Sequence, residues 1–173
     1  GFAPEALDRA RALELEVERR LVMTREPVRQ ALAYAREVGK RVVAISDTYF
    51  NKTEIEALLA SAGLEGAFDA IYISSELGAR KDRGDLWPLV LQTEGVATRS
   101  WLHVGDNEVS DMQRAGDRGL GVFHTMNPIT LLGQKRFFSP ATIKAADEAH
   151  GWTDALLLGP AAARLGGDPF PLD

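Results

Sequence analysis

The sequence has 173 residues, of which 45% are hydrophobic, and this is enough for one domain of ordinary size with a real core. A formal net charge of -5, with no segment in which lysine and arginine gather, argues against nucleic acid as a partner. The absence of cysteine excludes disulfides and thiolate catalysis and fits a reducing, cytoplasmic compartment. No apolar stretch approaches the roughly 18 residues that a membrane span needs.

Two amphipathic helices are predicted before the first strand. Pro4 opens a pattern of helical spacing, and a second pattern begins at Pro27 and stops at Gly39, which suits the left-handed position after a helix. Residues 41–46 are rich in β-branched side chains without polar alternation, which indicates a parallel strand covered on both faces. The predicted apolar face of the first helix comprises Leu7, Ala10, Leu13, Val17 and Leu21.

The alternation of strands and helices then repeats along the chain. Thr53 and Glu56 form a candidate capping box for the next helix, and Asp85 is a candidate cap for a later one with Pro88 in its first turn. The further predicted strands are residues 70–74, 101–105 and 120–123, with a helix over residues 109–115. This order predicts a three-layer α/β fold with right-handed crossovers and a ligand site at the carboxyl ends of its parallel strands.

Polar residues with complementary chemistry follow these strands. Ser46 ends the first strand, and Lys81 lies after the second. Asp106 and Asp111 lie five residues apart on a strand-to-helix turn, where both carboxylates can meet one hard cation. A lysine is a point charge suited to phosphate, and a serine hydroxyl can donate to a phosphoryl oxygen. Together they predict a site for phosphate and Mg²⁺.

The same residues resemble known motifs. Val43–Asp47, then Lys81, then Gly105-Asp106 with Asp111 resemble the second, third and fourth motifs of the haloacid dehalogenase (HAD) superfamily. This resemblance implies a Rossmann-like HAD core with a parallel sheet and a magnesium-dependent phosphohydrolase. The stretches SDTYFNKTEIEALLASAGL and YISSELGARKDRGDLW are similar to predicted hydrolases, some of them fused to or encoded near glycosyltransferases, and a glycosyltransferase module is therefore an expected partner.

The resemblance also implies roles for single residues. Ser46 would bind the transferred phosphoryl group, Lys81 would neutralise nucleophile and phosphate, and the two aspartates, Asp106 and Asp111, would hold Mg²⁺. The positions of two further residues leave alternatives open: Asp47 would line the site or cap the following turn, and Asn107 would position water or phosphate or, as favoured, cap a helix. His103 alternates within a buried strand and is interpreted as a core histidine.

One motif of the superfamily is missing. An Asp-x-Asp motif at the end of an early strand supplies the nucleophile and the general acid in that family, and none occurs in this sequence. In the family sheet this strand lies between those predicted here at residues 42–46 and 101–105. We therefore expect a partial piece of a longer protein. Residues 1–24 would be the end of a helical cap, residues 25–137 an incomplete core, and residues 138–173 a helical or irregular extension.

The sequence thus favours a magnesium-dependent enzyme that acts on a phosphorylated small molecule through an aspartyl-phosphate. Its nucleophile would lie outside this chain, and the chain alone would be inactive. The alternative is a catalytically silent domain of the same fold that serves binding or assembly. A Rossmann-type nucleotide binder is disfavoured, because no G-x-G-x-x-G follows any predicted strand.

Overall fold

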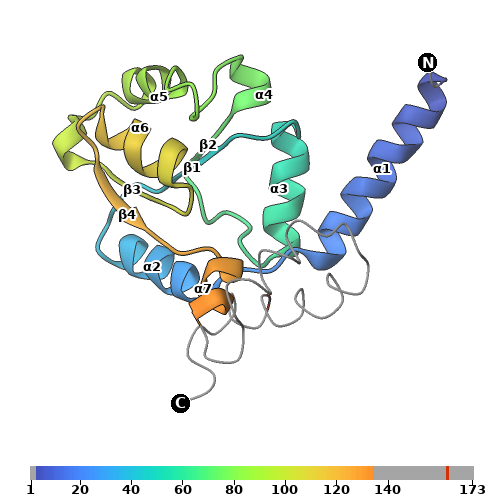
Figure 1. Ribbon diagram of the computed structural model, residues 1–173, viewed down its shortest axis with the longest axis horizontal. Helices are drawn as coiled ribbons and strands as arrows, with labels where there is room; N and C mark the ends of the chain where they lie inside the picture. The colour runs from blue at the N-terminus through green and yellow to red at the C-terminus, as the bar shows by residue number, and fades with distance from the viewer. Residues whose placement is uncertain (1–2, 135–162, 164–173) are drawn as a thin grey trace. The chain divides into compact units, whose positions relative to one another are not determined.

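The computed structural model describes residues 3–134 and residue 163 (Figure 1). Two compact units make up the chain. The first comprises Gly1–Thr24 and Val28–Gly78, and the second comprises Arg25–Pro27 and Ala79–Asp173. Each unit contains one pair of parallel strands, β1 with β2 in the first and β3 with β4 in the second.

The first unit places its helices around the β1–β2 pair. Its elements are α1 (Pro4–Leu21), α2 (Glu26–Glu37), β1 (Val43–Ser46), α3 (Lys52–Ser61), β2 (Ala70–Ile73) and α4 (Ser74–Leu77). The strands run in parallel, with Val43 opposite Ala70 and Ser46 opposite Ile73. Because Ser46 and Ile73 both end their strands, the chain leaves this sheet at one edge after each strand.

Helix α3 begins with a capping box, but not the predicted one. The side chain of Asn51 accepts the N–H of Glu54 at 2.9 Å, and the Glu54 carboxylate accepts the N–H of Asn51 at 2.7 Å. The prediction that Thr53 and Glu56 form this box is therefore wrong. The helix begins two residues earlier, because asparagine is as good an N-cap as threonine and is followed by glutamate at the same spacing.

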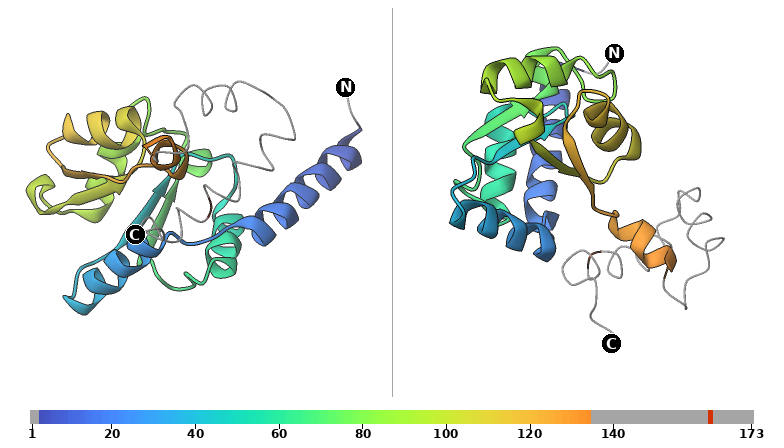
Figure 2. Two further views of the ribbon diagram at one scale, coloured as in Figure 1. Left: turned by 60° about the horizontal axis from the view of Figure 1, so that its bottom comes forward. Right: turned by 90° about the vertical axis from the view of Figure 1, so that its left-hand side faces the viewer.

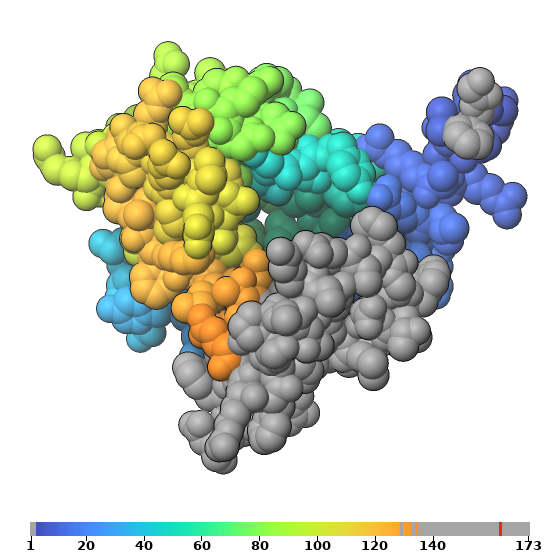
Figure 3. All heavy atoms as spheres, in the orientation of Figure 1, coloured from blue at the N-terminus to red at the C-terminus, as the bar shows by residue number. Residues whose placement is uncertain are grey.

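Helix α1 turns its polar face, and not its apolar face, toward the rest of the first unit. Arg11 donates two hydrogen bonds to Glu54 at 2.9 and 2.7 Å, and Tyr49 Oη lies 2.5 Å from Glu14. Figures 1 and 2 show the C-terminal part of α1 beside α3 and its N-terminal part extending past it, and Figure 3 shows the side chains that project from it. The predicted apolar face is exposed at Leu7, Leu13, Val17 and Leu21.

The second unit continues the alternation of helix and strand. Its elements are α5 (Leu86–Glu94), η1 (Thr98–Ser100), β3 (Leu102–Gly105), η2 (Glu108–Gln113), α6 (Arg114–Gly116), β4 (Gly121–His124) and α7 (Pro128–Gln134). Strands β3 and β4 are parallel, with Leu102 opposite Gly121 and Gly105 opposite His124. Among the described residues of this unit, the buried apolar side chains are Ala79, Leu86, Trp87, Val90, Ala115, Leu120 and Leu132.

Asp85 precedes α5 as predicted but does not cap it. Its side chain makes no capping hydrogen bond to the helix and instead accepts the backbone N–H of Arg80 at 2.6 Å. This bond closes the loop that carries Lys81. Pro88 lies in the first turn of α5, where its missing N–H costs nothing.

All four predicted strands are present, and they pair in parallel. The structure confirms a mixed α/β architecture, whereas a complete three-layer core is not seen among the described residues. The predicted extension at residues 138–173 falls outside the described residues, apart from residue 163. Within the described part of the chain, no helix combines the length and apolar character needed to cross a bilayer.

Candidate functional site

The first two predicted site residues follow β1 in the first unit. Ser46 is the last residue of β1 and Asp47 begins the loop after it, and both are half-buried. Ser74 holds this loop, because its Oγ accepts the N–H of Thr48 at 2.9 Å and donates to the Thr48 carbonyl at 3.1 Å. Sequence reasoning did not single out Ser74, although its place directly after β2 was a signal.

Lys81 lies in a turn whose backbone carbonyls accept hydrogen bonds from two arginines. The N–H of Gly84 donates to the carbonyl of Lys81 at 2.9 Å, which closes the turn. Arg114 donates to the carbonyl of Asp82 at 3.1 Å, and Arg118 donates to the carbonyl of Gly84 at 3.2 Å. The Lys81 turn is thereby tied to the helical segment that follows Asp111.

Asp111 is the centre of a buried polar cluster. Its Oδ1 accepts a hydrogen bond from Lys81 Nζ at 2.5 Å and lies 3.1 Å from His103 Nε2, and its Oδ2 accepts the N–H of Asn107 at 3.1 Å. Only 5% of the Asp111 side chain and 12% of the Lys81 side chain are exposed. We call Lys81, His103, Asn107 and Asp111 the Asp111 cluster. Two of the predicted site residues, Lys81 and Asp111, are thus in direct contact.

The electrostatics of the cluster favour an ionised Asp111. Burial raises the pKa of this carboxyl, but hydrogen bonds from His103 and Lys81, the positive charge of Lys81 and the N–H of Asn107 together lower the pKa by more. The net effect holds the pKa of Asp111 well below its usual range. A fixed anion at this place keeps the Lys81 ammonium oriented.

His103 belongs to this cluster, which sequence reasoning missed. It is buried, as predicted, but its ring contacts Asp111 and forms a T-shaped pair with the ring of Trp87, with ring centroids 4.6 Å apart. The alternation of residues along β3 predicts on which face of the strand His103 lies. It does not predict which side chains His103 contacts on that face. A signal was available, because His103 lies in β3 and Asp111 lies in the helical segment that follows the same strand, eight residues later.

Gly105 leaves room for the carboxylate of Asp111. A Cβ at position 105 would lie 2.5 Å from both Cγ and Oδ2 of Asp111, closer than real Cβ contacts come. The φ angle of Gly105 is not positive, so the glycine is needed for space and not for backbone freedom. The glycine of the Gly105-Asp106 pair thus has a steric basis in Asp111, six positions further on.

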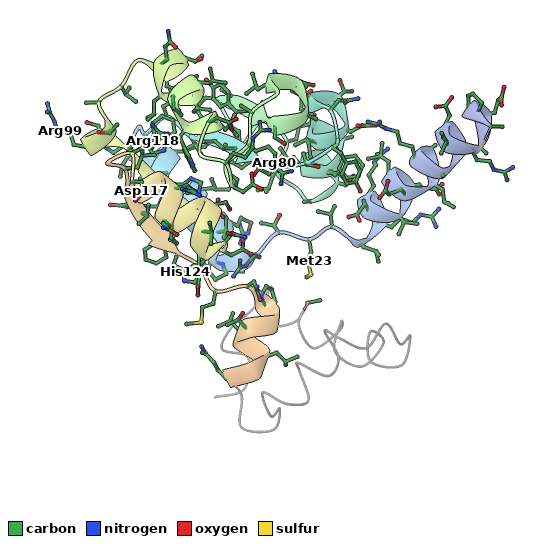
Figure 4. The ribbon with its side chains drawn as sticks, turned by 45° about the horizontal axis from the view of Figure 1, so that its top comes forward. Met23, Arg80, Arg99, Asp117, Arg118 and His124 are labelled. Carbon is green, nitrogen blue, oxygen red and sulfur yellow. The ribbon has the colours of Figure 1, made fainter. Side chains whose placement is uncertain are left out.

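Asn107 and Asp106 take different parts in the turn after β3. The side chain of Asn107 accepts the N–H groups of Val109 and Ser110 at 3.0 and 2.9 Å, so it caps η2, one of the two roles expected for it. The carboxylate of Asp106 is exposed, and its backbone carbonyl lies 3.0 Å from Nε2 of His124 on β4, which Figure 4 labels. The convergence of Ser46 with Lys81 and Asp106 stays a prediction, because Ser46 belongs to the other unit.

The two aspartates fit Mg²⁺ unequally. Asp106 offers an exposed carboxylate at the end of β3, whereas both oxygens of Asp111 already accept hydrogen bonds within the protein. Within the described residues, no group of three or more His, Cys, Asp or Glu side chains is arranged to hold a metal ion. Mg²⁺ often binds through one or two carboxylates together with waters and substrate phosphate, so this donor set fits that ion.

Comparison with known proteins concerns the fold. No family model matches the chain, and no curated protein matches it. Among solved structures, an uncharacterized protein from Listeria monocytogenes serotype 4b is similar over 80% of this chain and 82% of its own, with 21% identity and a TM-score of 0.56. A HAD phosphatase from Thermococcus onnurineus is similar over 56% of this chain, with 21% identity and a TM-score of 0.48. This chain spans 43% of that phosphatase. The similarity to the Listeria protein extends over most of both chains and shows a shared fold.

Proposed function

We propose that this chain is part of a magnesium-dependent phosphohydrolase of the HAD type. It would hydrolyse a phosphorylated small molecule, or transfer its phosphoryl group, through an aspartyl-phosphate whose aspartate lies outside these residues. The observation that carries the proposal is the buried contact of Lys81 Nζ with Asp111 at 2.5 Å, beside the exposed Asp106 at the end of β3. A glycosyltransferase module as partner stays a prediction from sequence likeness.

The predicted site residues would have different roles in binding the phosphoryl group. Lys81 would neutralise the phosphate and the nucleophile, with Asp111 fixing one of the three donor directions of its ammonium group. Ser46 would donate its hydroxyl to a phosphoryl oxygen, and Asp47 would line the same site. Asn107 would contribute mainly by holding the turn, since its side-chain oxygen caps η2.

Asp106 would bind Mg²⁺ directly, and Asp111 would act on it through water. When bound, the ion supplies positive charge that offsets the charge developing on the transferred group. The exposed carboxylate of Asp106 is suited to an ion that keeps several waters. The main role of Asp111 would then be to orient Lys81, and its contact with the ion through water would be secondary.

Metal binding by the chain itself tests the role of Asp106. Titration of MgCl₂ into ¹⁵N-labelled protein should shift the amide signals of Asp106 and Asn107, and Asp106→Asn should weaken this response about tenfold or more, because the amide lacks the charge that holds a hard cation. Asp117→Asn is the matched control, since Asp117 is exposed at the end of α6 in the same unit and is labelled in Figure 4. An unchanged response in Asp106→Asn would remove Asp106 from the metal site.

Activity is tested in a longer protein that carries an Asp-x-Asp motif before Gly1. There Asp106→Asn should lower phosphatase activity, and added Mg²⁺ should restore part of it. Lys81→Ala should lower activity in a way that Mg²⁺ does not restore, because its charge would act on the phosphate and the nucleophile. Full activity of Asp106→Asn, or no response to a chelator, would exclude this mechanism and favour the catalytically silent domain.

A further inference from the structure

His103 occupies the buried position of a strand whose neighbouring positions are exposed. The side chain of His103 is 8% exposed, while Leu102 and Val104 on the opposite face of β3 are 64% and 42% exposed. An aliphatic residue would satisfy the packing of such a position. A histidine there needs a polar partner, since burying an imidazole without one costs free energy.

Asp111 is that partner, and the ring of Trp87 packs against the imidazole of His103. Nε2 of His103 lies 3.1 Å from Oδ1 of Asp111, and the rings of Trp87 and His103 form a T-shaped pair with an interplanar angle of 76°. An ionised carboxylate only accepts hydrogen bonds, so Nε2 carries the proton in this contact. Trp87 is fully buried in α5, which leaves the imidazole ring little freedom to turn.

The same oxygen of Asp111 receives both His103 and Lys81. Oδ1 lies 2.5 Å from Lys81 Nζ, and Oδ2 is held by the N–H of Asn107. The bond from His103 therefore fixes the rotation of the carboxylate about its last bond, and with it the direction in which Oδ1 meets the ammonium group. Gly105 leaves space for this carboxylate but, having no side chain, does not form a hydrogen bond that would orient it.

We propose that His103 is a positioning residue, which orients the Asp111 carboxylate and through it the Lys81 ammonium group. Its importance for catalysis rests on the proposed function, whereas its effect on Lys81 is a property of this chain. His103 acts through Asp111 and is not expected to touch substrate. The amide of glutamine can place a donor near the position of Nε2, whereas asparagine is too short and leucine has no donor.

The ammonium signal of Lys81 tests this inference in the chain itself. In the ¹H-¹⁵N spectrum of the lysine side chains, a held ammonium group exchanges slowly with water. His103→Leu and His103→Asn should speed the exchange at Lys81 about tenfold or more, the effect of losing one hydrogen bond to a charged group, and His103→Gln should restore slow exchange. Val90→Ala is the control for general destabilisation, because Val90 is fully buried in the same helix as Trp87.

The variants separate positioning from packing. If Val90→Ala loses as much stability as His103→Leu but keeps slow exchange at Lys81, the effect of His103 is specific. If His103→Leu does not fold, the comparison of His103→Asn with His103→Gln decides. Equal exchange at Lys81 in those two variants would overturn the inference. The Mg²⁺ response of Asp106→Asn is independent of this result, so failure of the proposed function would be recognised separately.

Discussion

At the scale of single residues, Gly105 and Asp111 share a space that holds only one side chain. Gly105→Ala would put a methyl group 2.5 Å from the carboxylate carbon, so Asp111 must move away from Lys81 or the strand must shift. We expect a loss of about 1–3 kcal/mol in the free energy of unfolding, as is usual for overpacking, measured by urea denaturation. Gly116→Ala, where a Cβ meets nothing within 4 Å, should not lower stability.

The ionisation of Asp111 should make the free energy of unfolding depend on pH in the acidic range. Its folded pKa lies below the ordinary value of about 3.9, so the stabilisation is complete above that pH and is lost as the pH falls further toward the folded pKa. Asp111→Asn should cost on the order of 3 kcal/mol at pH 7, because it leaves Lys81 buried beside an uncharged amide. Urea denaturation between pH 7 and pH 2 should show the variant losing less on acidification than the parent chain. An equal acid dependence in both would contradict this account.

Prediction of single residues from the sequence was most successful where both the charge of a residue and its order in the chain pointed to the same site. Lys81 and Asp111 were chosen from their motifs, and they are in contact. His103 was expected only to be buried, because alternation along a strand gives a face and not a partner. The steric role of Gly105 was not foreseen, since it depends on the path of the chain through the next turn.

At the scale of elements, α1 is held to α3 by polar contacts. Arg11 bridges to Glu54, and this pairing lowers the pKa of the glutamate. Arg11→Ala should therefore speed amide hydrogen exchange in α1, measured by mass spectrometry. Arg20→Ala is the control, because Arg20 pairs with Glu16 inside α1 and not with α3. Equal acceleration in both variants would show that the Arg11 bridge does not hold the helix.

Helical periodicity located α1 and its apolar face, but the contacts of α1 with α3 are made by a different face. Leu15, which lies outside the predicted apolar face, is half-buried, while most of that face is exposed. Periodicity reports which residues share a side of a helix, and the choice of side is made by partners elsewhere in the chain. The start of α3 moved by two residues for a related reason, since Asn51 and Thr53 both precede a glutamate by three.

At the scale of the whole molecule, we expect this chain alone to have no phosphatase activity. In the proposed function Ser46, Lys81 and Asp106 would bind phosphate or metal, but none of them would supply the carboxylate that attacks phosphorus. An aryl phosphate with Mg²⁺ should be hydrolysed no faster than in buffer, as followed by absorbance. Magnesium-dependent hydrolysis that is abolished by Asp47→Asn would identify Asp47 as the nucleophile and overturn this expectation.

The alternation of strand and helix predicted the parallel pairing but not its extent. Four β-rich segments at the expected places form two pairs, and the complete sheet is not seen in the described part of the chain. Short apolar runs specify that a segment is a strand. They do not specify its neighbours, because those depend on contacts between distant parts of the chain.

The wide turn of η2 makes the length of this segment as important as its composition. Glu108–Gln113 wind as a π-helix, and the N–H of Met112 reaches the carbonyl of Asn107, five residues back, at 3.2 Å. Deleting one residue between Asn107 and Asp111 would let the turn tighten to an α-helix and rotate the following side chains by about 100° around its axis. Deletion of Val109 or Ser110 would remove no charged group and would still separate Asp111 from Lys81. Variation in length within this loop is therefore equivalent to losing the carboxylate.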